Sequence, residues 1–279
     1  VNCAGPFLGT AIPPAAAAAA AGAHYLDVSA EQASVQEVYR AAREWGDHVA
    51  IVPALAFYGG LADLMATAAA GSGNPAGGPE PAEKITVVFG VDRWWPTAGT
   101  RETGRRNTAP RLVVAGGRLV PAAGRESVLR SWEFSRDGLG HQAVAANPFS
   151  EIIAMQRHLP ASRISTYLTT RALDDVADPA TGGPRAADDE GRSAQRSEVD
   201  VVVRPARAAA GERRIAGAGR DIYAFTGTLV AEAARWLADG RARVTGVAAP
   251  GEAFAAAEFL EAFSPRDLEI RWAAENAES

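Results

Sequence analysis

Three short strand-like runs in the first 65 residues constrain the fold of this chain more than any other feature. They are VNCAGPF (1–7), HYLDVSAEQ (24–32) and VAIVPALAFYGG (49–60), and each leads through small or polar residues into a helical pattern. This alternation predicts a parallel sheet, because parallel neighbours need a long crossover that a helix can provide. Ligands of such sheets bind beyond the carboxyl ends of the strands. We therefore expect a cleft at the three turns.

The pattern changes after residue 71. Residues 71–81 are rich in Gly and Pro, as is typical of a domain boundary. From Glu83 onward apolar residues alternate with period two, and Gly116-Gly117 predicts a tight hairpin. The sequence therefore predicts an α/β fold in which a partial Rossmann-type parallel sheet (1–75) precedes a second α+β domain (82–222). We expect the second domain to be built on a mainly antiparallel sheet with few helices and to serve substrate binding or dimerisation.

Two acidic residues follow the second strand-like run. Asp27 and Glu31 flank the same strand end, where they could meet the amine of a substrate. Acidic side chains at a helix N-terminus also interact favourably with the helix dipole, and we favour that role for Glu31. Ser29 and Gln32 have the spacing of a capping box, which gives Ser29 a structural role.

Arginines in two loops are candidates for binding an acidic substrate. We expect residues 99–107, with Arg101 and Arg105, and residues 191–195, with Arg192, to be loops. Guanidinium groups bind carboxylates in a two-pronged fashion. The alternatives are a solvated first loop and a surface pairing of Arg192 with the acidic residues 188–190. Residues 178–192 are expected to form a mobile surface loop.

Composition excludes several classes of function. A net charge of −5 argues against a nucleic-acid partner. Cys3 is the only cysteine, so neither an intrachain disulfide nor a zinc cage can form, which fits a reducing cytoplasm. The apolar run 11–23 is too short to span a membrane and contains two prolines. The histidine spacing indicates no metal site. We therefore expect a cytoplasmic protein with a small-molecule substrate and no membrane partner, and we leave a homodimer open.

The strand-like runs also carry a family resemblance. VNCAGPF, HYLDVSAE and VPALAFYGGLADL resemble the second half of the nucleotide-binding domain of saccharopine dehydrogenase-like proteins. The resemblance continues through GTRETGRRN, DDEGRSAQ, GRDIY and GVAAPGEAF. It implies an oxidoreductase that uses NAD or NADP and acts on a small, amino-acid-derived acidic substrate.

The resemblance also implies where ligands bind. Two groups of residues would lie near the reactive end of the cofactor, namely Cys3, Ala4, Gly5, Pro6 and Phe7, and Tyr58, Gly59 and Gly60. Arg101, Arg105 and Arg192 would hold the substrate from the second domain. Residues 223–279 would pack back onto the first domain. No catalytic residue is assigned.

One feature of the family is absent from this sequence. The glycine-rich strand–turn–helix that cradles a pyrophosphate is not found, and we expect an N-terminal truncation. Gly71, Gly73 and Ala76 match the spacing G-x-G-x-x-A, but they follow a helix instead of a strand. Two alternatives therefore stay open: a non-catalytic protein that binds a metabolite or a partner, and a reductase of a lipid-linked enoyl or keto group.

Overall fold

The alternating segments at the start of the chain form a small parallel sheet. The computed structural model describes residues 1–71, 78–122, 130–134, 139–207, 211–263 and 268–272, so most of the expected linker 71–81 lies outside it. The sheet has the order β1 (Tyr25–Leu26), β2 (Ala50–Val52), β11 (Gly246–Val247), and both pairings are parallel. Asn2 extends it through a parallel bridge to Asp27. The predicted parallel sheet is confirmed, with shorter strands than expected.

The rest of the chain builds a nine-stranded sheet. Its main path has the order β12-β10-β9-β3-β8-β4-β5, and β7 joins β6 to β8. Only the pairing of β3 with β8 is parallel among those that the structure describes, so the predicted, mainly antiparallel sheet is confirmed. The strands are β3 (Ala82–Val91), β4 (Leu112–Ala115), β5 (Arg118–Pro121), β6 (Arg130–Glu133), β7 (His141–Ala146), β8 (Ala161–Thr169), β9 (Arg196–Pro205), β10 (Arg213–Arg220) and β12 (Leu268–Trp272).

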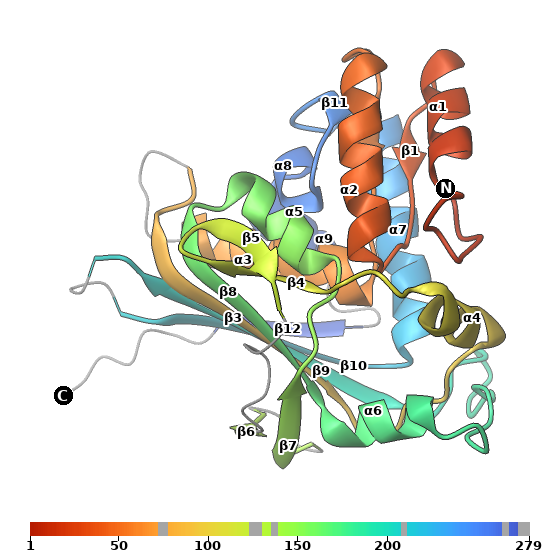
Figure 1. Ribbon diagram of the computed structural model, residues 1–279, viewed down its shortest axis with the longest axis vertical. Helices are drawn as coiled ribbons and strands as arrows, with labels where there is room; N and C mark the ends of the chain where they lie inside the picture. Colours follow the sequence, from red (N-terminus) through yellow and green to blue (C-terminus); the bar gives the residue numbers. More distant parts are fainter. Residues whose placement is uncertain (72–77, 123–129, 135–138, 208–210, 264–267, 273–279) are drawn as a thin grey trace.

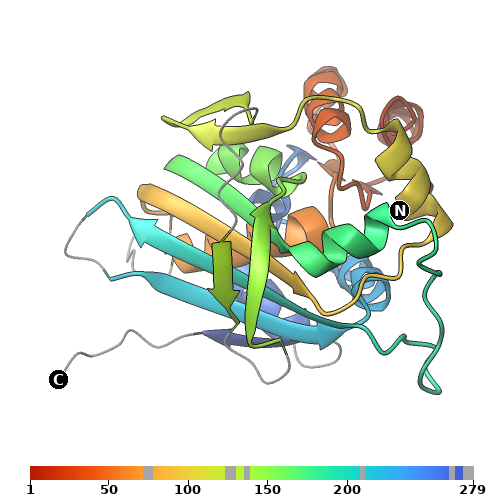
Figure 2. The same ribbon diagram turned by 60° about the horizontal axis from the view of Figure 1, so that its bottom comes forward.

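Helices cover the large sheet mainly on one face. Figure 1 shows α3, α5, α7 and α9 above this sheet and α6 with the β6–β7 pair below it, and Figure 2 shows the lower face from the front. The helical segments are α1 (Ile12–Ala20), α2 (Gln32–Ala41), η1 (Ala42–Glu44), η2 (Phe57–Leu61), α3 (Ala62–Gly71), α4 (Ala98–Arg106), α5 (Glu151–His158), α6 (Thr170–Ala177), α7 (Ile222–Ala238), α8 (Pro250–Ala253) and α9 (Ala256–Phe263).

One hydrophobic core joins the two sheets. Phe89 of β3 packs against Phe57 of η2 at 5.1 Å between ring centroids, and Phe57 contacts Phe225 of α7 at the same separation. On the opposite face of β3, Val88 is buried in a smaller cluster with Phe134. Apolar side chains on both faces of a strand require cover on both sides of the sheet. The parallel-sheet segment therefore packs directly on the large sheet.

The C-terminal segment contributes to both sheets. β11 adds a parallel strand to β2, while β12 pairs with β10 in antiparallel register. Between them, Phe254 and Phe259 stack at 5.0 Å and pack against Trp236 of α7. Residues 223–263 thus pack on the first 71 residues and on the large sheet. No helix in the described ranges is long and apolar enough to cross a membrane.

Two expectations about local structure are wrong. Residues 99–107 are expected to form a loop, but Ala98–Arg106 is the helix α4. Its N-cap is Thr97, whose hydroxyl accepts the N–H of Thr100. The predicted capping box is also wrong, because the N-cap of α2 is Glu31 and the Ser29 hydroxyl bonds the N–H of Glu31 instead. Helices α5 and α6 are not anticipated by the period-two pattern.

Candidate substrate site at the carboxyl ends of the parallel strands

Asp27 joins the ends of the two neighbouring strands β1 and β2. Its carboxylate accepts the N–H of Ala54 at 2.8 Å and of Ser29 at 3.0 Å, and its carbonyl accepts the N–H of Leu55 at 2.7 Å. The Tyr25 hydroxyl donates a further bond at 3.0 Å. Burial raises the pKa of Asp27, although the two backbone donors act in the opposite direction. The carboxylate is therefore held by its own chain, and contact with a substrate amine stays a prediction.

Glu31 joins the first and second strand ends. It is fully buried, and its carboxylate accepts the N–H of Phe7 at 2.7 Å and the N–H of Leu8 at 3.1 Å. The Glu31 carboxylate thus binds the backbone N–H groups that could otherwise bind an anionic ligand at the turn before α1. The backbone of Glu31 is the N-cap of α2. The structure gives this side chain a positioning role between two turns, and its predicted contact with substrate stays a prediction.

The turn 54–60 above β2 is closed by the start of α5. The buried hydroxyl of Ser150 donates to the carbonyls of Ser29, at 2.9 Å, and Tyr58, at 3.2 Å. Gly59 has φ +131°, and a Cβ there would lie 2.6 Å from both the Ser150 hydroxyl and the Ala54 carbonyl. Only glycine fits this close approach. Tyr58, Gly59 and Gly60 are themselves buried, so their contact with a cofactor stays a prediction.

Aromatic side chains pack around the turn 54–60. Tyr58 stacks on Phe149 with 4.3 Å between ring centroids and contacts Trp94 at 5.1 Å. The Tyr58 hydroxyl is buried without a hydrogen-bond partner among the described residues, and burial raises its pKa. An unpartnered hydroxyl in an apolar setting costs free energy unless a ligand or water satisfies it. Tyr58 is therefore a candidate to donate a hydrogen bond at this site.

Glu151 is the titratable group at this edge that sequence reasoning missed. It is fully buried in the first turn of α5, where its Oε1 accepts the N–H of Phe149 at 2.9 Å. Its Oε2 has no hydrogen-bond partner in the described part of the chain. Burial raises the pKa of Glu151 to about 7, although the hydrogen bond from the Phe149 N–H lowers it. Such a carboxyl can hold or release a proton near neutral pH.

Arg111 lies beside the aromatic ring of Phe149. Its guanidinium lies 5.6 Å from the centre of the Phe149 ring and donates to the Pro148 carbonyl at 2.8 Å. Gln32 fixes this region, because its side-chain amide bonds the Leu112 N–H and the carbonyls of Leu112 and Phe149. The run NPFSEIIAM has the acidic first turn of a helix, which could have located α5. No local pattern could have placed Arg111 beside it.

The three arginines predicted from sequence have other partners. Arg101 donates to the carbonyls of Val176, Asp178 and Thr181, and so fastens α4 to the segment after α6. Arg105 is exposed and pairs with Glu102 on the same helix. These contacts occupy donors that a substrate carboxylate would need.

Arg192 forms the surface pairing that was the alternative to substrate binding. Its Nε lies 3.0 Å from Asp188 Oδ2, and its Nη2 lies 2.9 Å from Glu190 Oε2. Asp188 also accepts the backbone N–H of Arg192 at 2.9 Å. The segment 178–192 has no regular helix or strand in the structure, as expected. A role for Arg192 in substrate binding stays a prediction.

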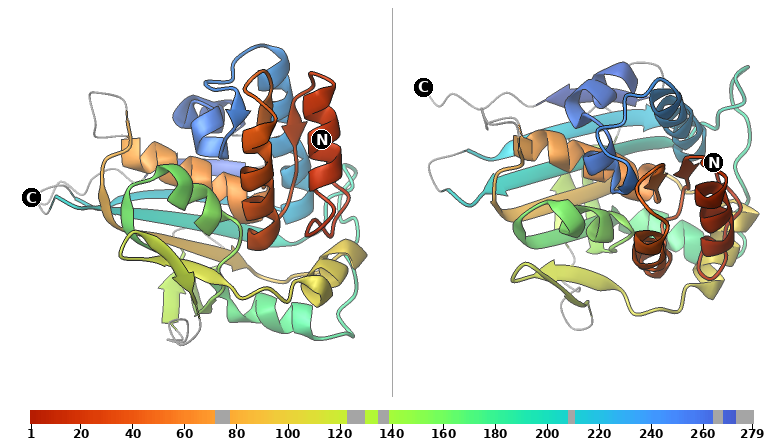
Figure 3. Two further views of the ribbon diagram at one scale, coloured as in Figure 1. Left: turned by 45° about the horizontal axis from the view of Figure 1, so that its top comes forward. Right: turned by 90° about the horizontal axis from the view of Figure 1, so that it is seen from above.

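The turn after the first strand-like run is open to solvent. Cys3, Ala4 and Gly5 are exposed, and the Gly5–Pro6 peptide bond is cis. A Cβ on Gly5 would lie 3.5 Å from the Thr103 hydroxyl, so α4 passes close to this turn, as Figure 3 shows. The first and second regions of the chain therefore meet at the predicted edge.

The strand ends do not fit a pyrophosphate. Backbone N–H groups at a glycine turn and a helix N-terminus normally bind it. Here the N–H groups of Phe7 and Leu8 bond Glu31, and those of Ala54 and Leu55 bond Asp27. A phosphate would have to displace a buried carboxylate. No group of three or more potential metal ligands occurs in the described residues either.

The order and pairing of the strands define the class of this fold. The chain has an α/β fold, with a small parallel sheet whose strand ends face segments from a large, mainly antiparallel sheet. No family model and no curated protein sequence matches the chain. Among solved structures it is similar to apo histidine-tagged saccharopine dehydrogenase (L-Glu forming) from Saccharomyces cerevisiae. The TM-score is 0.57 at 11% identity, with 92% of this chain and 81% of that one covered. At this identity the likeness establishes the fold.

Proposed function

We propose that this chain is a saccharopine dehydrogenase-like oxidoreductase that uses NAD or NADP and acts on a small, amino-acid-derived acidic substrate. The observation that carries the proposal is the fold likeness over 92% of the chain. Ligands of such parallel sheets bind at the carboxyl ends of the strands. The perturbed groups Tyr58 and Glu151 lie at that edge in this chain, which supports the same location for its site.

The proposal assigns roles to the side chains of Arg111, Glu151, Tyr58, Phe149 and Trp94. Arg111 binds the substrate carboxylate, because a guanidinium can hold it with two parallel hydrogen bonds. Glu151 holds or releases a proton near neutral pH, and the Tyr58 hydroxyl donates a hydrogen bond. Phe149 and Trp94 exclude water from the edge. Arg101, Arg105 and Arg192 serve the surrounding structure in this account.

Nicotinamide absorbance tests the function directly. The chain is assayed with millimolar NADH or NADPH as reductant and a panel of 2-oxo acids paired with amino acids as amine donors, and in the reverse direction with NAD or NADP. Arg111→Gln should raise the Michaelis constant for the acid about 10- to 100-fold through loss of a charge-assisted contact. The exposed Arg118 of β5 provides the matched control Arg118→Gln, which should leave it unchanged.

The outcomes distinguish failure of the proposed oxidoreductase activity from failure of the role proposed for Arg111. Absence of nucleotide oxidation or reduction with every pair would contradict an oxidoreductase. Turnover with an unchanged Michaelis constant in Arg111→Gln would contradict only the role of Arg111.

One observation favours a second candidate, a non-catalytic protein that binds a small metabolite. The carboxylate of Glu31 already occupies the backbone donors at the turn before α1. Because a side chain of the protein itself bonds these donors, the residues at the strand ends can bind a metabolite without a nucleotide. Substrate-induced amide shifts at residues 54–60 that do not depend on NAD(P) and accompany no turnover would support this candidate.

A further inference from the structure

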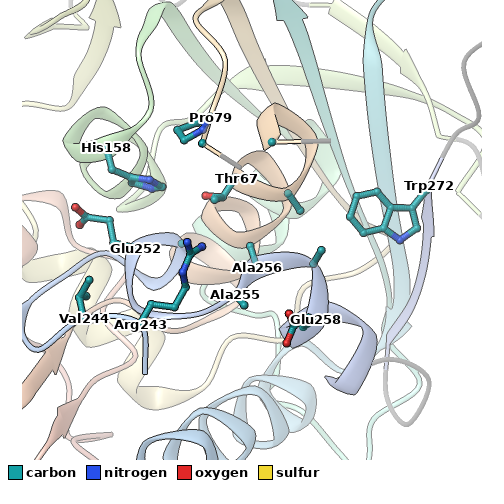
Figure 4. A pocket seen from close by; sticks show the side chains of 15 residues that line it. Thr67, Pro79, His158, Arg243, Val244, Glu252, Ala255, Ala256, Glu258 and Trp272 are labelled. Atoms are coloured by element: carbon teal, nitrogen blue, oxygen red, sulfur yellow. The ribbon is translucent and has the colours of Figure 1, made fainter. Parts of the chain in front are cut away.

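A hollow lies away from the strand-end residues. Its volume is about 600 Å³, within the range of small-molecule sites. It lies between the C-terminal half of α3, the end of α5, the α8–α9 segment and the end of β12. Figure 4 shows His158 entering from α5 and Arg243 rising toward Thr67 of α3. None of its lining residues belongs to the strand-end site.

The wall of the hollow is mostly small and apolar. Ala68 of α3 and Ala255 and Ala256 of the α8–α9 segment line it, and Figure 4 shows Trp272 of β12 at one side. Trp272 is 42% exposed, although large apolar side chains are usually better covered. An apolar wall with a few polar groups is the usual lining of a site for a small organic molecule. This wall suits a short hydrocarbon or ring.

His158 is a mostly buried side chain in the lining of the hollow. Its Nε2 lies 2.8 Å from Asp63 Oδ1, and the other oxygen of Asp63 accepts the N–H of Gly251 at 2.7 Å. These contacts fix the ring, so the proton on Nε2 points to Asp63. Nδ1 has no hydrogen-bond partner among the residues that the structure describes. Burial opposes protonation of His158, but the charge and hydrogen bond of Asp63 outweigh it and raise the pKa. When the ring carries its second proton, that proton is on Nδ1, because Nε2–H is directed at Asp63.

Among the described residues, each charged side chain of the lining except Arg243 has an oppositely charged neighbour. His158 pairs with Asp63, Glu252 pairs with Arg157, and Glu258 lies 4.0 Å from Arg241. Arg243 is exposed and forms no ion pair with the residues that the structure describes. Its guanidinium is therefore the uncompensated charge of the lining. A guanidinium in the same lining as a histidine is suited to one anionic group.

We propose that this hollow binds a small organic molecule with one carboxylate or phosphate group, which Arg243 and His158 Nδ1–H hold while its apolar part lies on the alanine wall beside Trp272. The two anionic groups share the same chemistry of recognition. The proposal is independent of the function proposed for the strand-end site, because it uses none of the same residues.

Side-chain NMR tests the proposal in the intact chain. Long-range ¹H–¹⁵N spectra report His158 and the Trp272 indole while hexanoate or inorganic phosphate is titrated. Hexanoate should shift both signals along one saturable curve, whereas phosphate, which has no apolar part, should shift His158 alone. The tighter of the two probes identifies the preferred group. Arg243→Gln should raise the dissociation constant about tenfold or more. Arg40→Gln, on the exposed side of α2, removes the same charge and should change it less than about twofold.

Two results would overturn the proposal. One is a linear, unsaturated response of His158 to both probes up to about 100 mM, which indicates no site. The other is an equal loss of binding in Arg243→Gln and Arg40→Gln, which indicates attraction by net charge alone. Retained folding of both variants is checked by their unchanged amide spectra away from the substituted residues.

Discussion

Three buried carboxyl groups, those of Asp27, Glu31 and Glu151, lie at the strand ends. Asp27 and Glu31 are buried acids whose carboxylates accept backbone N–H groups. Burial raises the pKa of both Asp27 and Glu151, but Glu151 differs because one of its oxygens lacks a hydrogen-bond partner among the described residues. Buried carboxyl groups therefore position the turns at Asp27 and Glu31, whereas the carboxyl of Glu151 has a pKa near neutral pH.

Glu151→Gln should change how stability depends on pH. The pKa of Glu151 rises from 4.5 in the unfolded chain to about 7 in the folded one. Between these values the unfolded state releases the proton first, so the free energy of unfolding falls as pH rises from about 4.5 to 7. We expect the difference between wild type and Glu151→Gln to change by about 3 kcal/mol across that range. Denaturant unfolding at successive pH values measures it.

The exposed Glu83 supplies the control for that comparison. Glu83→Gln should follow the wild-type pH dependence throughout. A pH-independent difference between Glu151→Gln and wild type would show that Glu151 titrates normally.

At the scale of elements, the unexpected helix α4 links the N-terminal turn to the rest of the chain. Sequence reasoning assigned residues 99–107 to a loop because two glycines and three arginines interrupt any apolar stripe. In the structure the stability of α4 comes from tertiary contacts at its start. The Tyr223 hydroxyl accepts the Trp94 indole N–H at 2.9 Å and the Thr97 N–H at 3.3 Å, and lies 2.9 Å from the Thr100 hydroxyl.

Tyr223→Phe should therefore loosen α4 selectively. Loss of the hydroxyl leaves the indole N–H of the buried Trp94 without its acceptor, which should cost about 1–3 kcal/mol. Hydrogen exchange should become faster at residues 98–106 while the amides of α3 keep their protection. Tyr39→Phe is the matched control, because the Tyr39 hydroxyl is buried without a partner, and its removal should be neutral or stabilising. Equal destabilisation in both variants would argue against this role for Tyr223.

For the whole molecule, local patterns predicted the two sheets but not the contacts between them. Alternating strand–helix order and period-two alternation each follow from neighbouring residues, so the parallel and antiparallel sheets could be read directly. Ser150 bonds the carbonyl of Ser29 across 121 positions, and Gln32 reaches Phe149 across 117. No periodicity records such separations. The strand-end edge was therefore predictable, whereas Glu151, Ser150 and Arg111 became visible only in the folded chain.

A titration with NADPH, followed by backbone amide NMR, tests the central claim most directly. The claim is that ligand binds at the strand ends although the pyrophosphate donors there are already bonded. The account predicts weak binding, with a dissociation constant of about 1 mM or higher, and saturable shifts concentrated at residues 4–8, 27–31 and 54–60. Micromolar binding would contradict the conclusion that these residues do not fit a pyrophosphate. Shifts confined to other parts of the chain, or none at all, would contradict the location of the site.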